Sequence, residues 1–457
     1  MTRGARWLAL LVAGAFFMEI LDATVIAPAA PHIAEDLRVA AVSINVAITA
    51  YVLTLAVLIP ISGWLTERFG ARRIFTLAIV VFTLASAGCA AATSLPMLVA
   101  TRVLQGVGGA MMVPVGRLVV IRTTEKTDLV RAIAYLTWPA LVAPLIAPAL
   151  GGVLSTYASW RWIFLINVPL GLIALPLALR LVPEVRSDDA GRLDVRGFLL
   201  AACGIAALVF GLEGVAATRP RWSLALSALV LAAAALTATI LHLMRAERPL
   251  VDLRILAVRT YRVTAFGGSV FRAVITAIPF LLPLFFQLGF GWSAAHAGLL
   301  VIALFAGNIG IKPATTPLMR RFGMRTVMFG SVLASAACLV GIAWLQPTTP
   351  LLLLLGLLAL SGVFRSVGFT TYNTVAFADV PQPRMTSANT LMSTVQELGG
   401  GLGVAAGALL VRLGAGVGAD GDGPYRFAFV LLALLLAVPA VEAFLLPREA
   451  GNVVAGR

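Results

Sequence analysis

The sequence has few charged side chains, cysteines and histidines. Only 12% of its 457 residues are Asp, Glu, Lys or Arg, whereas soluble domains contain roughly 25%. Its three cysteines, Cys89, Cys203 and Cys338, lie in apolar runs without CxxC spacing. This excludes a disulfide framework, and the three scattered histidines offer no metal-ligand cluster. We therefore expect no metal and no cofactor, and a chain unlike a soluble domain.

Long apolar runs dominate instead, since 60% of the residues are hydrophobic. A helix needs about 20 mainly apolar residues to cross a bilayer. We predict an all-α integral membrane protein with fourteen membrane-spanning helices, at 7–29, 43–65, 74–93, 96–122, 131–157, 161–182, 195–217, 222–244, 261–289, 294–317, 326–345, 350–377, 386–412 and 425–446.

Positive charge is unevenly placed between these runs. Of the 34 Lys and Arg residues, 23 lie on the side of the N terminus and 6 on the other side. Short cytoplasmic loops carry an excess of Lys and Arg, so we predict a multi-pass protein with both termini cytoplasmic. The net charge of +14 follows from this bias and implies no nucleic-acid partner.

One short motif occurs twice. GWLTERFGARR (63–73) and PLMRRFGMR (317–325) share Leu, Arg, Phe, Gly and Arg at matching positions, and each follows the second span of a group of six. We predict a six-helix half at 1–182, an inserted two-helix segment with its linkers at 183–260 and a second six-helix half at 261–457. Duplicated halves are typical of transporters, whose site lies between them near the midplane.

These motifs also resemble a known family. GWLTERFGARR resembles the loop signature of the major facilitator superfamily, and LDATVIAPAAPHI (21–33) the first-helix signature of its fourteen-helix drug:proton antiporter branch. RVLQGVGGAMMVPVGR (102–117) resembles the fourth-helix signature, whose arginine is Arg102 here. PALVAPLIAPALGG (139–152) lies where the antiporter motif of helix five belongs, with Pro144, Pro148, Gly151 and Gly152.

The resemblance covers nearly the whole chain. It implies a major facilitator fold with two inserted central helices and a proton-coupled multidrug exporter of the bacterial inner membrane. It also implies a monomer, with a small molecule, protons and the lipid bilayer as its partners. The chain departs from the motifs at Glu67, where aspartate is usual, and at Ala140, Ala143 and Ala147, where glycine is usual.

An ionisable residue within a membrane span costs free energy, so each such residue is a candidate for a functional role. At 1.5 Å per residue, Asp22 and Arg102 lie at similar depths, about 10 and 9 Å below the outer ends of their spans. Glu19 is one turn deeper on a similar face. We predict that Arg102 faces Asp22, and Glu19 with it, to couple transport to proton movement. A permanent structural ion pair is the alternative.

The other charges within spans have two interpretations each. Arg117 and Lys312 lie near the inner ends of their spans, which favours snorkelling or a place at a cytoplasmic gate over substrate contact. Arg272, Arg365 and Glu397 lie deep in the second half. We expect one arginine to pair with Glu397, which leaves the other free. The alternative is that both arginines are in structural pairs that use neighbouring carbonyl groups.

Polar and aromatic side chains are candidates for the rest of the substrate cavity, although interhelical packing is the simpler role for any one of them. The set comprises Gln287, Asn308, Tyr372, Asn373 and Trp138. The loop motifs are candidates for gating at the cytoplasmic end, with positive-inside topology as the alternative. That set comprises Glu67, Arg68, Gly70, Arg72, Arg73, Arg117, Arg321 and Gly323.

The charge balance leaves the substrate open. The predicted cavity spans hold Glu19 and Asp22 against Arg102, Arg117, Arg272 and Arg365, a net positive set. Exporters of lipophilic cations favour unpaired acids, so an organic anion or an anionic metal chelate is the alternative substrate. No catalytic constellation or nucleotide-binding motif is present, so we expect no enzyme and no ATP-driven pump.

Overall fold

The computed structural model describes residues 3–184, 186, 191–216, 221–416 and 421–447. Within these ranges the chain forms helices and no strand. Thirteen helical stretches of the described chain are long and apolar enough to cross a membrane, and one bent pair adds a fourteenth. The all-helical fold predicted from the sequence is confirmed.

The helices fall into three sets in chain order. The first helix group comprises α1 (Arg3–Asp36), α2 (Asn45–Leu58), α3 (Ser62–Phe69), α4 (Ala71–Ala90), α5 (Leu95–Thr123), α6 (Leu129–Tyr157), α7 (Trp162–Leu165) and α8 (Asn167–Leu181). The middle pair comprises α9 (Val195–Ala216) and α10 (Trp222–Arg245). The second helix group comprises α11 (Arg259–Leu284), α12 (Ala294–Gly310), α13 (Lys312–Phe322), α14 (Met324–Ala343), α15 (Leu351–Ala378), α16 (Met385–Gly416), α17 (Gly423–Leu435) and α18 (Ala437–Leu445).

Short 3-10 and π segments interrupt or connect these helices. They are η1 (Ala41–Ile44), η2 (Ile59–Ile61), η3 (Lys126–Asp128), η4 (Leu253–Ala257), η5 (Phe285–Gly289) and η6 (Gln382–Arg384). The predicted span 294–317 is one of the interrupted ones, because α12 and α13 meet at a bend of 50°. Pro313 explains the break, since it lacks a backbone N–H and is tolerated in the first turn of a helix but not in its interior.

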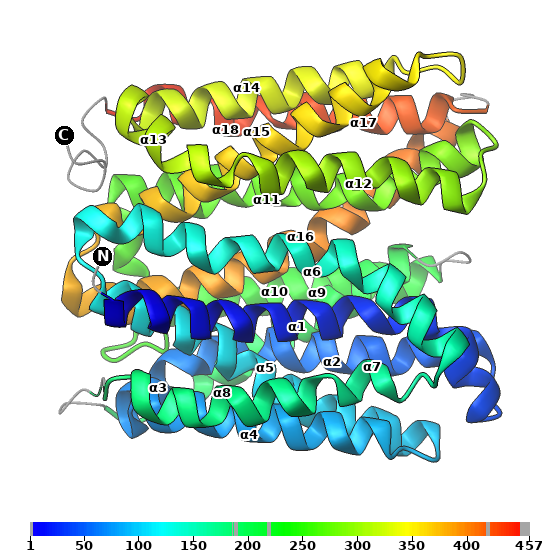
Figure 1. Ribbon diagram of the computed structural model, residues 1–457. Coiled ribbons are helices and arrows are strands. Elements are labelled where there is room, and N and C mark those ends of the chain that lie inside the picture. Colours follow the sequence, from blue (N-terminus) through cyan, green and yellow to red (C-terminus); the bar gives the residue numbers. More distant parts are fainter. Residues whose placement is uncertain (1–2, 185, 187–190, 217–220, 417–420, 448–457) are drawn as a thin grey trace.

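Helices of one group pack mainly against each other. In the first group α1 packs on α6 and α4 on α5, and in the second group α11 packs on α16 and α12 on α15. Of the middle pair, α9 packs on α2 and α16, where the two groups meet, and α10 packs on α9. Figure 1 shows the first group below the second, with the start of α1 at the left edge near α3 and α13. We call this edge the motif end, because both copies of the repeated motif lie there.

The two motif copies share a backbone feature. Gly70 follows the last residue of α3 as its C-cap, with φ of 91°, and Gly323 follows α13 in the same way, with φ of 82°. Both values lie in the positive-φ region that favours glycine over residues with a Cβ. The recurring glycine therefore turns the chain in the same way into α4 and into α14, which explains why the motif contains it twice.

The two helix groups share an apolar core at the motif end. Buried side chains from the end of α5 and the start of α6 belong to the same apolar cluster as α11 to α18: Leu118, Ile121, Leu129, Val130 and Ile133. Two other buried clusters lie within the first group. The shared cluster therefore packs part of the junction between the groups at the motif end.

Candidate functional site

Asp22 lies at the centre of a buried hydrogen-bonded network in the first helix group. Its carboxylate accepts hydrogen bonds from the Arg102 guanidinium, from Gln105 Nε2 at 2.8 Å and from Asn167 Nδ2 at 3.0 Å. Each of these four side chains belongs to a residue that is 0% exposed. We call Asp22, Arg102, Gln105 and Asn167 the Asp22 network. The structure brings together Asp22 and Arg102, and it adds two amides.

Further side chains complete the surroundings of the Asp22 network. Gln105 Nε2 donates to Ser86 Oγ of α4 at 2.7 Å. The Arg102 guanidinium carbon lies 4.1 Å from the ring centroid of Tyr51 and 5.8 Å from that of Phe164. A buried charge is tolerated when it is paired and hydrogen-bonded, and aromatic faces add to the stabilisation of a guanidinium. The hydrogen bonds of the network therefore tie α1, α4, α5 and α8 together, while Arg102 Nε and Nη2 and Asn167 Oδ1 have no hydrogen-bond partner among the described residues.

Glu19 lies one helical turn from Asp22 but faces other charges. Electrostatic interactions link it to Glu397 of α16, to Arg117 of α5 and to Asp22. Its side chain is buried and forms no ion pair within 4.0 Å with any residue that the structure describes. Glu19 therefore lies between the two helix groups and outside the Asp22 network. Asp22 faces Arg102 as predicted, but Glu19 forms no ion pair with Arg102 in the described chain.

A central cluster of charges gathers around Glu19. Arg117 lies within electrostatic range of Arg272 and Glu397, and Arg272 within range of Glu397 and Arg365. We call Glu19, Arg117, Arg272, Arg365 and Glu397 the central cluster. In the described ranges none of the five forms an ion pair within 4.0 Å. Three arginines against two glutamates leave one formal positive charge.

Arg272 and Arg117 interact electrostatically with Glu397, but the described chain shows no ion pair within 4.0 Å between Glu397 and an arginine. Glu397 instead lines a cavity of about 210 Å³ between α2, α9 and α16, together with Glu213. Glu213 accepts a hydrogen bond from Thr49 at 2.8 Å. The cluster arginines lie over aromatic rings at 4.8 to 5.8 Å: Arg272 over Phe369, Arg117 over Phe16 and Arg365 over Phe305. Glu397 thus faces α9 of the middle pair. The depth of a residue in its span does not predict this, because depth does not show which helices are neighbours.

Arg117 connects the two helix groups. Its Nη1 donates to Gln396 Oε1 at 2.9 Å, and Gln396 Nε2 donates to Asn373 Oδ1 at 2.8 Å. This chain of hydrogen bonds runs from α5 through α16 to α15. Arg117 therefore does not snorkel to the end of its helix, and Asn373 reaches the central cluster through Gln396.

More hydrogen bonds join the groups towards the motif end. Asn389 Nδ2 of α16 donates to the Pro114 carbonyl at 2.8 Å, and Arg122 of α5 donates to Thr386. On the other side of the bundle, Lys312 Nζ donates to Thr137 of α6 at 3.0 Å and to Thr370 of α15 at 2.7 Å. With the shared apolar core, these contacts close the protein at the motif end.

The loop-motif residues take different positions at this end. Glu67 lies 3.9 Å from Arg122, which itself reaches the second helix group. Arg72 Nε donates to the Val182 carbonyl at 2.6 Å and so holds the end of α8. Arg68, Arg73 and Arg321 are exposed, with Arg321 5.6 Å from the Phe322 ring centroid. Glu67 is thus the motif residue next to the junction of the groups.

The remaining predicted cavity residues are spread over the second group. Tyr372 packs on Phe271 and donates to the Pro439 carbonyl at 3.4 Å, so it lies inside that group. Asn308 is fully buried, and neither of its amide atoms has a hydrogen-bond partner among the described residues. Gln287 lies in η5, at the end opposite the motif end. The Trp138 side chain lies outside the described residues.

The helix-five motif lies on α6 where that helix packs against α1. A Cβ at Gly151 would come within 2.6 Å of the Val25 carbonyl oxygen, whereas Gly152 has open space beside it. Ala143 and Ala147 are fully buried. Pro144 is partly buried, and the Pro148 side chain lies outside the described residues. Gly151 thus permits the close approach of α1 to α6, and alanine suffices at 143 and 147.

The neutral partners of the charges were not among the residues predicted from the sequence. Gln105 and Asn167 donate to Asp22, Gln396 accepts from Arg117, and Asn389 donates to the α5 backbone. Amides within spans are less costly than charges and therefore give a weaker signal. The spacing of Gln105 three residues after Arg102, on the same helix face, was the available clue.

The chain matches known proteins over nearly its full length. The model of the Major Facilitator Superfamily matches residues 12–404 and 264–455. A protein of Cronobacter sakazakii named "Putative multidrug resistance protein MdtD" is 40% identical over 455 residues, which cover 96% of this chain and 94% of that protein. A protein of the same name from Klebsiella pneumoniae is 37% identical over 462 residues, covering 98% and 96%.

Solved structures share the fold. The crystal structure of the human organic anion transporter MFSD10 (TETRAN) superposes with a TM-score of 0.69 at 15% identity, covering 97% of this chain and 100% of that one. The proton:xylose symporter XylE superposes with a TM-score of 0.66 at 15% identity, covering 98% and 97%. These likenesses concern the fold alone.

In the described chain, two packed helix groups and a middle pair make up fourteen spans, with charges gathered between the groups, and this arrangement defines a multi-pass membrane transport protein. The chain belongs to the Major Facilitator Superfamily. It is accordingly a transporter of small molecules and not an enzyme, as the sequence predicted. Its curated relatives are named for multidrug resistance, which makes it similar to a drug-type exporter.

Proposed function

We propose that the protein is a proton-coupled antiporter that exports amphiphilic drugs or other toxic compounds by alternating access. We place it in the bacterial inner membrane as a monomer, with both termini and the motif end in the cytoplasm. Residues 1–182 and 261–457 are the two halves that move against each other, and 183–260 is the inserted segment. Relatives named for multidrug resistance support a drug-type exporter.

The central cluster is the observation that carries this proposal. Glu19 and Glu397 come from different helix groups and interact electrostatically with Arg117 and, for Glu397, with Arg272, without an ion pair in the described structure. A carboxylate prefers its charged form next to an arginine and its neutral form when buried away from one. Movement of one group against the other therefore changes the proton affinity of Glu19, which is what coupling to protons requires.

The Asp22 network has a supporting place in this proposal. Asp22 and Arg102 are fully buried and hydrogen-bonded, whereas Glu19 lies at the junction of the groups. We propose that the network holds α1 against α5 and so fixes the distance from Glu19 to Arg117. Asp22 and Arg102 then contribute to coupling through Glu19, and a proton that reaches Asp22 weakens this hold.

The proposed gate lies at the motif end. Glu67 and Arg122, together with Asn389, Arg117 and Lys312, join the two groups there and separate when the cytoplasmic side opens. The driving force is adequate for export, because one proton crossing 100 mV supplies about 2.3 kcal/mol. That free energy sustains roughly a forty-fold concentration gradient.

A flux assay tests the function. Pure protein is reconstituted in liposomes that contain a pH dye, and tetraphenylphosphonium is added across an imposed pH gradient with the membrane potential clamped. Proton movement that depends on both the protein and the cation is the expected result. Protein that moves the cation equally fast with and without the pH gradient would contradict proton coupling.

One alternative has an observation in its favour. The central cluster holds three arginines and two glutamates, and this excess of positive charge suits an organic anion or an anionic metal chelate. The same liposomes are therefore tested with citrate. Proton movement with citrate and none with tetraphenylphosphonium would replace the drug exporter by an anion exporter, with the cluster arginines as the recognition site.

A further inference from the structure

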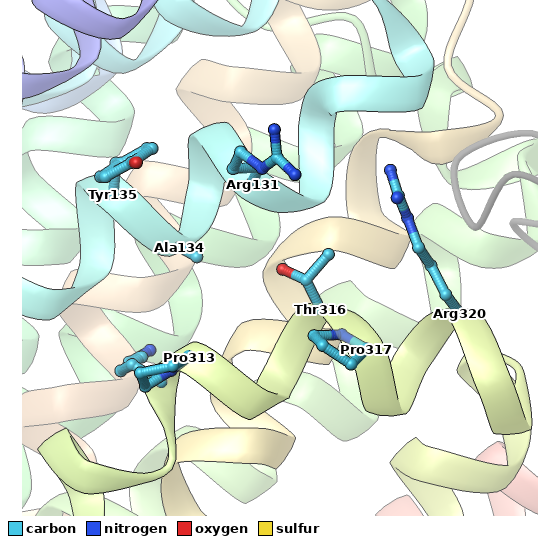
Figure 2. Close-up of a pocket in the computed structure, with 8 residues that line it drawn as sticks. Arg131, Ala134, Tyr135, Pro313, Thr316, Pro317 and Arg320 are labelled. Atoms are coloured by element: carbon cyan, nitrogen blue, oxygen red, sulfur yellow. The ribbon is translucent and has the colours of Figure 1, made fainter.

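A large cavity lies between the two helix groups at the motif end, away from the central cluster. Its volume is about 660 Å³, and it is lined by residues of α6 and α13. Figure 2 shows Arg131 and Tyr135 on α6 across from Thr316, Pro317 and Arg320 on α13. One wall therefore belongs to the first helix group and the other to the second.

The cavity is strongly basic. Arg131, Lys312 and Arg320 line it, and none of its described lining residues is acidic. Arg6 of α1 lies nearby, with its guanidinium carbon 5.9 Å from the Tyr135 ring centroid. Lys312 Nζ is held by two threonine hydroxyls rather than by a carboxylate. The cavity thus offers a site where positive charge from three helices favours an anionic group.

The cavity is also amphiphilic and opens at the edge of the bundle. Arg131 and Arg320 are exposed, and they lie in the first turn of α6 and in the last turn of α13. Pro313 and Pro317 are exposed on the same bent span, and Ala134 adds to the apolar wall. Cations at the rim with an apolar wall behind them match a molecule that carries one anionic head and an apolar tail.

We propose that this cavity binds an anionic phospholipid, with the phosphate between Arg131 and Arg320 and an acyl chain along α13. Guanidinium groups recognise phosphate oxygens by two parallel hydrogen bonds. A phosphatidylglycerol headgroup carries net negative charge, whereas the ammonium of phosphatidylethanolamine cancels its phosphate charge, so that this lipid gains little from the same arginines. Because one arginine belongs to each helix group, the bound lipid holds the motif end closed.

This proposal is independent of the transport direction and of proton coupling. It requires only the folded protein and a bilayer, so a protein that failed every flux assay would still be expected to bind the lipid. The proposed function in turn does not require the lipid, because the flux assay reports on the central cluster. Failure of one is therefore distinguishable from failure of the other.

The test measures lipid binding to the full-length protein by native mass spectrometry. Phosphatidylglycerol and phosphatidylethanolamine with the same acyl chains are titrated separately into the detergent-solubilised protein. Each arginine near an anionic lipid contributes about five-fold to binding. Arg131→Gln/Arg320→Gln is therefore expected to bind phosphatidylglycerol about twenty-five-fold more weakly, with phosphatidylethanolamine binding unchanged.

Two further variants make the result specific. Arg180→Gln is the matched control, because Arg180 is an exposed arginine in the last turn of α8 at the same end but does not line the cavity. Arg131→Lys/Arg320→Lys keeps both positive charges, and we expect it to recover most of the binding. An equal loss in the Arg180 variant, or no loss in the double glutamine variant, would overturn the proposal.

Inorganic phosphate distinguishes a lipid from a soluble anion. In lipid-free detergent, the midpoint of thermal unfolding is measured with phosphate alone and with phosphatidylglycerol alone. We expect the lipid to raise the midpoint of the native protein, and not of the double glutamine variant, while millimolar phosphate has no such effect. Stabilisation by phosphate and none by the lipid would reassign the cavity to a soluble anion.

Discussion

The Asp22 network and the central cluster lie one helical turn apart on α1 and are built in opposite ways. In the network a carboxylate accepts from an arginine and two amides, and all four residues are fully buried. In the cluster two glutamates and three arginines from both helix groups lie together without an ion pair in the described chain. Charges in an ion pair hold helices in place, whereas charges without one are available to change partners.

This difference separates stability from coupling. Breaking a buried ion pair by removing one partner leaves an uncompensated charge, which destabilises a protein by about 3–5 kcal/mol. Removing a charge that has no partner carries no such penalty. The comparison therefore predicts that substitutions in the network reduce stability and that substitutions in the cluster alter transport while the protein stays folded.

The largest expected effect concerns Arg102→Ala. The substitution leaves Asp22 buried without its ion-pair partner and removes the contact with the Tyr51 ring, so the free energy of unfolding should fall by about 3–5 kcal/mol. Unfolding in detergent, followed by tryptophan fluorescence, measures it. Arg365→Ala is the matched control, because Arg365 is buried and has no ion pair within the described chain. Equal losses in the two variants would break the comparison.

Asn167→Ala tests whether the amides belong to the network. Asn167 donates to the Asp22 carboxylate at 3.0 Å and is fully buried. Hydrogen bonds to charged groups contribute about 1.5–3 kcal/mol, so we expect a loss of about 2 kcal/mol in the same unfolding measurement. Asn373→Ala is a useful contrast, since its partner Gln396 is neutral and the loss should be nearer 1 kcal/mol.

The sequence predicted much of this arrangement for physical reasons. Apolar runs long enough to cross a bilayer identify the spans, and a depth of 1.5 Å per residue placed Asp22 and Arg102 at one level. Depth does not specify rotation about the helix axis, which is why Glu19 was expected beside Arg102 and Glu397 beside an arginine. The direction of Glu397 depends on α9, whose place against α2 and α16 leaves no local pattern in the sequence.

Glu19→Gln sharpens the comparison from the side of the cluster. The amide keeps the shape of the side chain but cannot release a proton. The rate of tetraphenylphosphonium transport driven by a pH gradient should therefore fall at least about ten-fold, which corresponds to about 1.4 kcal/mol. Proton movement is measured in the proteoliposome assay between pH 6 and pH 8. The unfolding free energy should stay within about 1 kcal/mol of the native value, and a larger fall would assign Glu19 to the scaffold.

The smallest effect is expected for a satisfied carboxylate outside the membrane. Asp194, just before α9, accepts hydrogen bonds from Gly197 N–H at 2.8 Å, Leu250 N–H at 3.2 Å and His242 Nε2 at 2.8 Å. Burial raises the pKa of the Asp194 carboxyl, but these hydrogen bonds together outweigh burial and hold its pKa below the usual value. Like Asp22 it fixes a junction between segments, but its partners are two backbone N–H groups and a histidine rather than a guanidinium.

The sign of the pH dependence follows from this lowered pKa. The stabilisation is present above the unfolded value, near pH 4, and is lost as the pH falls through the lower folded value. Asp194→Asn should therefore cost about 1 kcal/mol at pH 5, and the gap to the native protein should narrow at pH 3. A gap of the same size at both pH values would show that the carboxylate charge of Asp194 does not anchor α9. The contrast with the central cluster would then hold only for charges buried within the membrane-spanning helices.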